Sequence, residues 1–469
     1  MEPTSCAGCQ QRDQRITALQ ERVAALETEL QNLRARLGQN ASNSSVPPSA
    51  NPPDAPKPVV KKPTGRPRGA QPGHPPRLRR RLPPERLQQV ITYVPATCQR
   101  CQTPLPAQRS ADDPEPLWHQ VAELPAVAAQ VIEYQAHGRC CPCCGEITWA
   151  KIPDAVRART IGPRLSATMS LLSGAHQVSR RSVEEIVETV FDVPVSLGTV
   201  SHLEAEMSQA LLPAHTAALQ AVREAAVKNV DETGWKQAGQ KRWLWSGATA
   251  TVAAFVITLG RGAAGLVALL GQAIRGIVGS DRWSAYGRLP VEQRQVCWAH
   301  LKRDFQKCVD RGGAAVTVGE GGLAVVQKLF RHWYAFRGGG CDRARLRQRL
   351  RPVQRALRQV LVQGSACADG PTAHFCQNVL ALEPALWTFA RVAGVEPTNN
   401  HIERLHRKAV LWRKKSFGSQ SAEGCRFVER ILTVVQTLRL QERPVLEYLC
   451  LTLEAHRAGL PGPKLMLGD

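Results

Sequence analysis

The chain has 469 residues, of which 43% are hydrophobic and 21% charged, so a wholly disordered chain is excluded and roughly two to four domains are expected. Its 61 Lys and Arg exceed its 39 Asp and Glu, which gives a net charge of +22 and a pI near 9.8. Such a balance points to a polyanionic partner. Nucleic acid is the first candidate and an anionic membrane surface is the second.

The N-terminal residues lack the basic start and apolar core of a signal peptide, so we expect an intracellular, cytoplasmic protein. The longest uncharged run, Trp243–Gly260, contains several Ser and Thr and two glycines. It is predicted as a pair of strands rather than a membrane span. Fifteen cysteines in such a compartment favour free thiols and metal ligands over disulfides.

Residues 10–38 carry apolar side chains at alternating steps of three and four, the heptad pattern of a coiled coil. The seam consists of Ile16, Leu19, Val23, Leu26, Leu30, Leu33 and Leu37. With Ile16 at an a position, Arg22 faces Glu27 across a parallel dimer, which is an attractive pair. We predict a homodimer formed through this segment. The alternative is an amphipathic helix packed on its own domain.

Residues 39–84 are predicted as a disordered linker. Their first part is rich in Ser, Asn and Pro and buries too little apolar surface to fold. The second part is basic and contains GRPRG, in which Arg66 and Arg68 flank Pro67. This resembles the core of an AT-hook, whose arginines lie in the minor groove of DNA. The alternative is a basic tether without specific contacts.

Residues 85–152 are predicted to form a zinc ribbon. They contain two C-x-x-C pairs separated by stretches of alternating apolar residues, which favour strands, and four thiolates so arranged hold a structural Zn²⁺. The expected ligands are Cys98, Cys101, Cys141 and Cys144. This register places Pro142 and Gly145 in the second turn. The alternative register uses Cys140 with Cys143.

Residues 153–225 follow a helical pattern with short loops. Within them, Ser179–Met207 has the helix, short turn and second helix of a helix-turn-helix, and Ser196 or Thr199 starts the second helix. We predict a DNA-binding domain of this kind. A helical spacer that makes no DNA contact is the alternative.

Residues 226–305 change to a pattern of strands and are predicted as the first part of a catalytic core. The expected order is strand, strand, strand, helix, strand, with Asp231 ending the first strand and Asp281 ending the fourth. If these two strands are neighbours in the sheet, the two carboxylates lie side by side. Glu232 points to the opposite face of its strand and is the weaker candidate.

Adjacent carboxylates repel each other, and they also repel a phosphodiester, unless cations neutralise them. Two Mg²⁺ or Mn²⁺ ions about 3.5 to 4 Å apart can activate a water or a 3′-hydroxyl and stabilise the leaving oxygen. Glu403 is the expected third carboxylate. Thr398, Asn399 and Asn400 are suited to cap a helix that begins near residue 400, and Glu403 then lies in its first turns.

The helix predicted to carry Glu403 is also strongly basic, and its cations would hold DNA phosphates while the carboxylate faces the metal ions. Its expected DNA-contacting residues are Arg404, Arg407, Lys408, Arg413, Lys414 and Lys415. Elsewhere, His300 and Asp304 are interpreted as an ordinary helical pair rather than as groups that support the site. Trp283 and Trp298 are interpreted as core residues rather than as platforms for an unstacked base.

Five segments, VDETGW, SDRWSAY, CWAHLKRDF, PTNNHIERLHRKAVLWRKKSFGSQS and RFVERILTVVQT, resemble the DDE transposases of the insertion-sequence-sixty-six family of bacterial mobile elements. The N-terminal heptads, the linker, GRPRGAQPGH and the Cys-rich segment resemble that family in the same order. The resemblance implies an RNase H-like α/β core, interrupted by a helical insertion at 306–395 and completed by the C-terminal helices at 396–469. It also implies that Asp231, Asp281 and Glu403 are the catalytic triad.

The expected fold class is thus multidomain α+β, and the expected function is that of a dimeric, zinc-containing DNA transposase. It would cut at element ends with Mg²⁺ and join the freed 3′-hydroxyl to target DNA. Its partners would be the terminal repeats, the target DNA and accessory proteins of the same element, at the nucleoid and without a membrane. The alternatives are an inactive DNA-binding regulator derived from such an enzyme, or a structure-selective nuclease on the same core.

Overall fold

A computed structural model describes residues 7–37 and 81–466. The predicted linker at 39–84 lies almost wholly outside the described residues, and so do Arg66 and Arg68 of the AT-hook-like sequence. No helix within the described ranges is long and apolar enough to cross a membrane.

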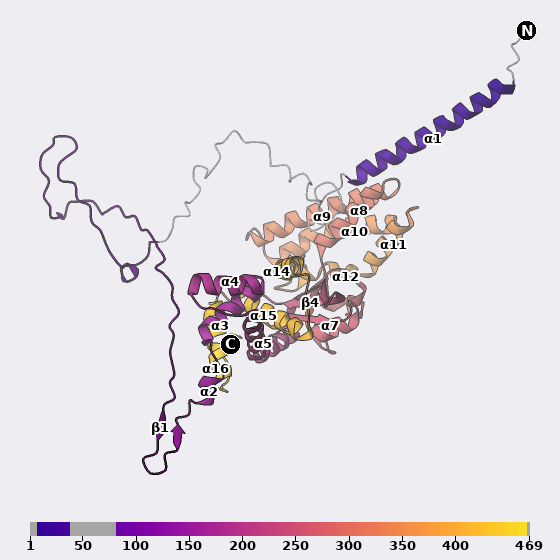
Figure 1. The fold of residues 1–469 in the computed structure, drawn as a ribbon. Coiled ribbons are helices and arrows are strands. Elements are labelled where there is room, and N and C mark those ends of the chain that lie inside the picture. Colours follow the sequence, from indigo (N-terminus) through magenta and orange to yellow (C-terminus); the bar gives the residue numbers. More distant parts are fainter. Residues whose placement is uncertain (1–6, 38–80, 467–469) are drawn as a thin grey trace, which may run out of the picture. The chain divides into compact units, whose positions relative to one another are not determined.

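The N-terminal segment forms a single helix, α1 (Ala7–Leu37), as the heptads predict (Figure 1). The seam residues whose side chains are described are all exposed by 45% or more; they are Ile16, Leu19, Val23, Leu26 and Leu30. Exposed side chains at heptad spacing favour pairing with a second helix over packing on the chain's own domain. The homodimer itself stays a prediction.

The chain divides into two compact units, residues 57–129 and residues 130–469 with the N-terminal segment. In the first unit, the described residues 81–129 have little regular structure. Its described part contains the 3-10 turn η2 (Pro84–Arg86) and an isolated antiparallel bridge between Thr97 and Pro104, beside the first cysteine pair.

The strands expected between the two cysteine pairs are not formed. Residues 105–137, all of them described, contain no strand, and alternating apolar side chains such as Val121 and Leu124 are exposed. An alternating pattern makes a stable strand only where its apolar face packs on another surface. The sheet of the expected ribbon is therefore reduced to one antiparallel hairpin, β1 (Gly138–Cys140) and β2 (Ile147–Trp149), around the second cysteine run.

The predicted helical region begins the large unit. Its helices are α2 (Asp154–Arg157), α3 (Pro163–Ser170), the π-helical turn η3 (Leu171–Ala175), α4 (Arg180–Phe191), α5 (Leu197–Ala210) and α6 (Leu212–Glu224). The side chain of Ser179 caps α4, and that of Ser196 caps α5. The two helices of the predicted helix-turn-helix are thus present at the expected positions.

Helix α5 does not have the composition of a DNA-reading helix. It contains no Lys or Arg, and Val200, Leu203 and Met207 on it are buried. Its Glu204 is also buried and lies 2.6 Å from Arg180 on α4. A helix that enters a DNA groove presents cations and polar groups to the phosphates and base edges. These features favour the helical spacer, and DNA binding by this pair stays a prediction.

A mixed five-stranded sheet follows, in the order β5-β4-β3-β6-β7. Its strands are β3 (Val227–Gln237), β4 (Gln240–Ala248), β5 (Ala253–Thr258), β6 (Ile277–Ser280) and β7 (Arg294–Val296). Strands β3, β4 and β5 are antiparallel neighbours, whereas β6 and β7 run parallel to β3. The predicted order of three strands, a helix (α7, Ala263–Leu270) and a strand is confirmed.

Helix α15 (Ala422–Leu440) covers the β5 edge of the sheet by direct hydrogen bonding. The backbone N–H groups of Ala253, Phe255 and Ile257 donate to the side chains of α15 residues spaced four apart. The acceptors are Thr437 (3.0 Å), Thr433 (3.0 Å) and Glu429 (2.5 Å). Four helical residues rise about 6 Å and two strand residues about 6.8 Å, so the two repeats match. An edge occupied in this way is protected from pairing with other chains.

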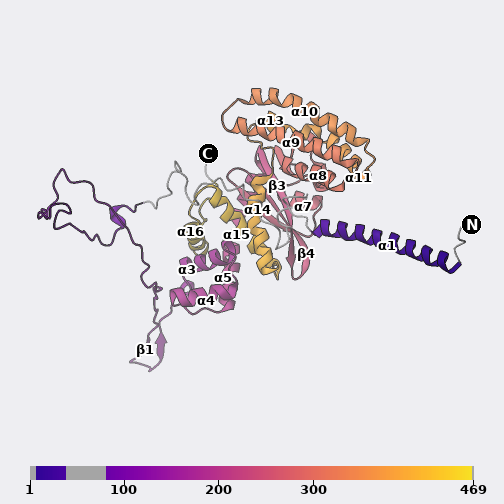
Figure 2. The ribbon, with the colours of Figure 1, turned by 90° about the horizontal axis from the view of Figure 1, so that it is seen from above.

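A helical region with one hydrophobic core lies in the range 306–395, where the sequence predicts a helical insertion. After α8 (Trp298–Arg311) it contains α9 (Ala315–Arg337), α10 (Arg343–Ser365), α11 (Gly370–Ala381), α12 (Glu383–Leu386) and α13 (Thr388–Arg391). The Gln295 side chain on β7 donates to the Leu386 carbonyl (3.3 Å) and accepts from the Phe389 N–H (2.7 Å). The insertion thereby covers the β7 edge. Figure 2 shows the insertion and helices α3 to α5 on opposite sides of the sheet.

The chain ends with α14 (Asn400–Ser416), α15 and α16 (Val445–Arg457). Helix α14 contacts β3 and β4, and α16 contacts α3 and α5. The start of α14 at Asn400 agrees with the sequence prediction. The sheet and α14 are therefore brought together around the residues that the sequence singles out.

Candidate active site

Asp231 and Asp281 lie at the same level of two neighbouring parallel strands. Asn229 of β3 pairs with Gly279 of β6. Asp231 lies two residues after Asn229, and Asp281 lies two residues after Gly279. The predicted position of Asp231 at a strand end is wrong, because β3 continues to Gln237 as the partner of β4. The neighbouring strand β6, by contrast, ends at Ser280. Asp231 therefore lies within β3, just beyond the point where β6 stops.

Glu403 is brought to this place by contacts of the residue that precedes α14. Asn399 does not cap the helix: its side chain donates to the Val230 carbonyl (2.7 Å) and accepts from the Asn229 amide (2.7 Å). Its backbone N–H donates to the Cys297 Sγ (3.1 Å). Asn399 is thus a buried link from α14 to β3 and to the start of α8.

The electrostatics of Asp231 show that the acids converge. Its pKa is raised well above the ordinary value by burial and then by the negative charges of Glu232, Asp281 and Glu403. Within the described part of the chain, Glu403 Oε1 is buried and has no hydrogen-bond partner. The negative charges of Asp281, after β6, and of Glu403, on α14, therefore both act on the buried carboxylate of Asp231 on β3.

Glu232 has a different environment, as its position on the strand predicts. Its side chain is only 1% exposed, accepts a hydrogen bond from the Tyr286 hydroxyl and lies 2.8 Å from Arg261. Arg261 neutralises the Glu232 carboxylate, and Arg261 and Tyr286 each bond to one of its oxygens. The structure therefore leaves Glu232 as a structural acid behind the three converging carboxylates.

Two histidines lie beside the acids. His300 Nδ1 is 3.7 Å from Glu403 Oε1, and His406 Nδ1 is 3.6 Å from Asp231 Oδ2 and 2.9 Å from the Ser246 hydroxyl. Burial lowers the pKa of His406 to about 3, so its imidazole is neutral near pH 7. Nothing in the sequence pattern marks His406, because its partner Ser246 is distant in the chain.

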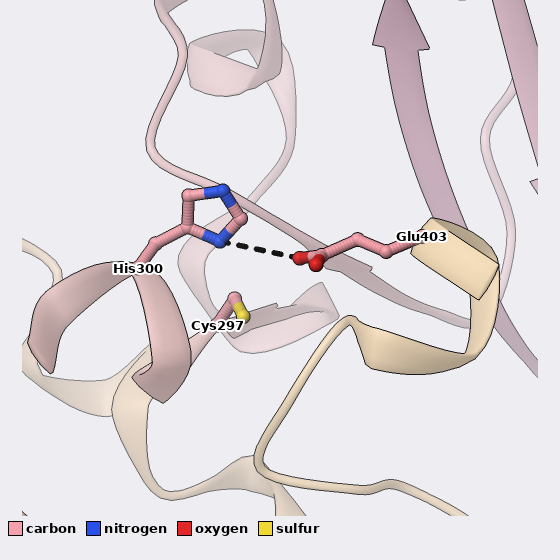
Figure 3. A group of neighbouring side chains, drawn as sticks. All are labelled: Cys297, His300 and Glu403. Atoms are coloured by element: carbon pink, nitrogen blue, oxygen red, sulfur yellow. Dashed lines mark ion pairs between the residues drawn. The ribbon is translucent and has the colours of Figure 1, made fainter. Parts of the chain in front are cut away.

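The interpretation of His300 and Asp304 as a helical pair is wrong. Asp304 binds Arg282 (2.5 Å) and Lys307 (3.1 Å), whereas His300 faces Glu403, as Figure 3 shows. The spacing of four residues predicts that His300 and Asp304 contact each other along the helix. Instead, His300 lies next to Glu403 of α14, and Asp304 pairs with Arg282 and with Lys307.

The two tryptophans differ. Trp298 is fully buried and donates its indole N–H to the Leu386 carbonyl (2.8 Å), so its core role is confirmed. Trp283 is 37% exposed, and the guanidinium of Arg261 stacks 3.8 Å from its ring centroid. The core interpretation of Trp283 is therefore wrong, since its ring lies at the surface next to Asp281 and is held by a cation.

The basic residues of α14 divide into two groups. The exposed ones are Arg404, Arg407, Lys408, Lys414 and Lys415. Arg413 is half-buried and donates to the Thr233 hydroxyl (3.2 Å) and to the Gly234 carbonyl. Arg413 thus holds α14 on β3, while the exposed group forms a positive surface on the same helix as Glu403.

The two cysteine pairs begin in turns of the same kind. In each, the first cysteine's N–H donates to the carbonyl five residues later, and its carbonyl accepts from the N–H four residues later, at 2.8 to 2.9 Å. These turns begin at Cys98 and Cys141, and the residue after each pair, Gln102 or Gly145, has a positive φ. Hydrogen bonding, chiefly with Thr103, lowers the pKa of Cys101 to about 7. The zinc ligands stay a prediction.

Residues 160–426 match the model of a protein family described as Transposase IS66 family, a span that includes the three converging acids. The match places the chain among DNA-processing enzymes of the transposase class. Because it covers more than half of the 469 residues, the chain belongs to the IS66 family of transposases.

A relative among curated proteins is the uncharacterized protein y4qI of Sinorhizobium fredii (strain NBRC 101917 / NGR234). It is 26% identical over 248 residues, which cover 48% of this chain and 46% of the relative. The matching region therefore spans about half the length of this relative.

Replacing Asp231 with Asn is expected to stabilise the metal-free protein near pH 7. Because folding raises the pKa of Asp231, the ionised carboxylate costs stability, and this cost appears as the pH rises above the ordinary value of about 4. Asn keeps the acceptor for the Glu232 N–H but carries no charge. The gain in the free energy of unfolding should be on the order of 1 kcal/mol.

Urea unfolding in a chelator between pH 4 and pH 8 measures this effect. The wild type should lose stability relative to Asp231→Asn as the pH rises, and added Mg²⁺ should restore the wild type more than the variant. A variant less stable than the wild type at pH 7 would contradict the repulsion between the acids.

Proposed function

We propose that this transposase cuts DNA at the ends of a mobile element and joins the freed 3′-hydroxyl to target DNA. The observation that carries the proposal is the convergence of Asp231, Asp281 and Glu403 from β3, β6 and α14 in a member of a transposase family. The order of the mixed sheet, with its helical insertion before the third acid, supports an RNase H-like core.

The three acids fit divalent cations. Burial and then the negative charges of Glu232, Asp281 and Glu403 raise the pKa of Asp231, and Glu403 Oε1 is without a hydrogen-bond partner among the described residues. Carboxylate oxygens are the ligands that Mg²⁺ and Mn²⁺ prefer. We assign Asp231, Asp281 and Glu403 to hold two such ions, which when bound supply Lewis acidity to phosphoryl transfer.

The surrounding residues position these acids. The neutral His406, hydrogen-bonded to Ser246, lies 3.6 Å from the Asp231 carboxylate on the α14 side and adds no charge there. Arg413 fastens α14 to β3, and the exposed cations of α14 would bind the phosphates that flank the scissile bond. Glu403, one of the three acids, and the phosphate-binding residues are thus carried by one helix.

Replacing Arg404, Arg407 and Lys408 together with Ala should weaken binding to duplex DNA by a similar factor for every sequence. Each lost phosphate contact should lower the slope of log affinity against log salt by about 0.9. Fluorescence anisotropy at several salt concentrations measures this slope. Arg413→Ala should instead lower stability, because this side chain bonds to β3. An unchanged slope in the triple variant would contradict the phosphate-binding role.

Three further parts of the proposal rest on the sequence. The structural Zn²⁺ of Cys98, Cys101, Cys141 and Cys144 is supported by the common hydrogen-bond pattern of the two turns. A homodimer through α1 is supported by the exposed seam. The protein would act on terminal repeats and target DNA in the cytoplasm, at the nucleoid, with accessory proteins of the same element.

The test is a reaction of the purified chain with the element's terminal DNA, a target plasmid and Mg²⁺. Joined products that require Mg²⁺ support the transposase. Specific binding without any cleavage would indicate a regulator derived from such an enzyme, and hydrolysis without joining would indicate a nuclease. Either of these two results, obtained with any accessory proteins present, would overturn the proposal.

A further inference from the structure

A cysteine, a histidine and Glu403 meet where α8 begins. Cys297 is the N-cap residue of α8 and is 1% exposed, and His300 lies one turn later on the same helix. Figure 3 shows the His300 and Glu403 side chains pointing toward each other with Cys297 beside them. One ligand atom from each of the three residues lies within 4.8 Å of the others.

Two atoms in this cluster lack partners. His300 Nδ1 and Glu403 Oε1 are both buried, and neither has a hydrogen-bond partner among the residues that the structure describes. They are 3.7 Å apart, which is too long for a hydrogen bond. Buried polar atoms are nearly always satisfied, so two that face each other at this distance indicate a place for a cation between them.

The hydrogen-bond donors around the Cys297 sulfur favour its thiolate form. It accepts a hydrogen bond from the Asn399 N–H (3.1 Å), and it lies against the backbone N–H groups of Ala299 and His300 at the start of the helix. Helix N-termini stabilise thiolates. The sulfur is buried, so a thiolate at this position needs a bound cation to neutralise it. A coordinated metal ion deprotonates such a thiol.

The chemistry of the three ligands selects the cation. Thiolate, imidazole and carboxylate together are the ligands of Zn²⁺, whereas Mg²⁺ requires oxygen ligands and rarely accepts sulfur. Glu403 is the only one of the three that suits both ions. The charge of Glu403 acts on Asp231, and its carboxylate also belongs to the cluster with Cys297 and His300.

We propose that Cys297, His300 and Glu403 form a second cation site that takes Zn²⁺ and shares Glu403 with the site for Mg²⁺. This inference rests on the proposed function, since zinc inhibits catalysis by withdrawing Glu403 from Asp231 and Asp281. The fourth position of a tetrahedral zinc ion is left for water. Free zinc thereby acts as a negative regulator of DNA cleavage.

Zinc content tests the site without reference to activity. The full-length wild type, Cys297→Ser and the matched control Cys308→Ser are equilibrated with micromolar Zn²⁺, and bound metal is measured after gel filtration. Cys308 is a buried cysteine on the same helix but outside the cluster. The wild type and Cys308→Ser should each retain one zinc ion per chain more than Cys297→Ser. Equal zinc content in all three would overturn the inference.

Inhibition tests the sharing of Glu403. With Mg²⁺ fixed and Zn²⁺ increasing, the wild type and Cys308→Ser should lose DNA cleavage at a zinc concentration at least about 10-fold lower than Cys297→Ser. Loss of a direct ligand weakens a metal site at least as much as loss of a group that supports a ligand, which costs about 10- to 100-fold. Urea midpoints confirm that the variants fold. Equal sensitivity to zinc would overturn the inference. If the wild type never cleaves DNA with Mg²⁺, the proposed function fails, and the zinc content alone still decides whether the site exists.

Discussion

A Glu403→Gln variant is expected to lose DNA cleavage by on the order of 10³-fold or more, while its affinity for terminal DNA changes little. Gln has the size and shape of Glu but no charge, so the fold of α14 is retained. What is lost is the third negative group opposite Asp231 and Asp281, which together would hold the cations. Rates of nicking and joining in Mg²⁺, with anisotropy for DNA affinity, measure the two effects separately.

A matched control is Glu423→Gln, which removes the charge of an exposed acid at the start of α15. This variant should cleave at the wild-type rate. Asp231→Asn and Asp281→Asn should behave like Glu403→Gln. Cleavage by Glu403→Gln at the wild-type rate would remove Glu403 from the catalytic set and leave it as an ion-pair partner among basic residues.

An Asn399→Ala variant is expected to lose both stability and activity. The substitution leaves the Val230 carbonyl and the Asn229 amide without their partner in a buried place. Each orphaned group costs about 1 to 3 kcal/mol, so the free energy of unfolding should fall by about 2 to 6 kcal/mol. The start of α14 is no longer tied to β3, and Glu403, one turn later, loses its position against the aspartates.

Urea unfolding measures the loss of stability, and cleavage measured well below the unfolding midpoint isolates the loss of positioning. Asn400→Ala is the matched control, since Asn400 is the exposed neighbour of Asn399 and should change neither property by much. If Asn399→Ala proves as stable and as active as Asn400→Ala, the link between α14 and the sheet has no role in building the site.

Much of the core could be predicted because its signals are local. Strands β4 and β5 contain the apolar and aromatic residues of the uncharged run Trp243–Gly260, β3 carries its apolar residues at the predicted place, and α14 begins at the predicted residue. Strand β7 was not predicted, since it has only three residues and two of them, Arg294 and Gln295, are polar although buried. The polar side chain of Gln295 is buried because it bonds to residues of the helical insertion, and no local sequence pattern reveals these partners.

The candidate site divides in the same way. Asp281 and Glu403 follow from a strand end and a helix start, whereas the place of Asp231 in mid-strand depends on the shortness of β6. The contacts of His300 with Glu403 and of His406 with Asp231 join residues far apart in sequence. Only the folded chain brings these pairs together, so spacing along one helix was misleading for His300.

The central claim is that three carboxylates from β3, β6 and α14 share one cation-binding place. Anomalous diffraction from crystals soaked in Mn²⁺ tests it most directly, because Mn²⁺ substitutes for Mg²⁺ at oxygen ligands and is located without reference to activity. We expect anomalous peaks within coordinating distance of Asp231, Asp281 and Glu403 that disappear in Asp281→Asn. Ordered Mn²⁺ elsewhere on the protein with no peak among these three acids would contradict the claim.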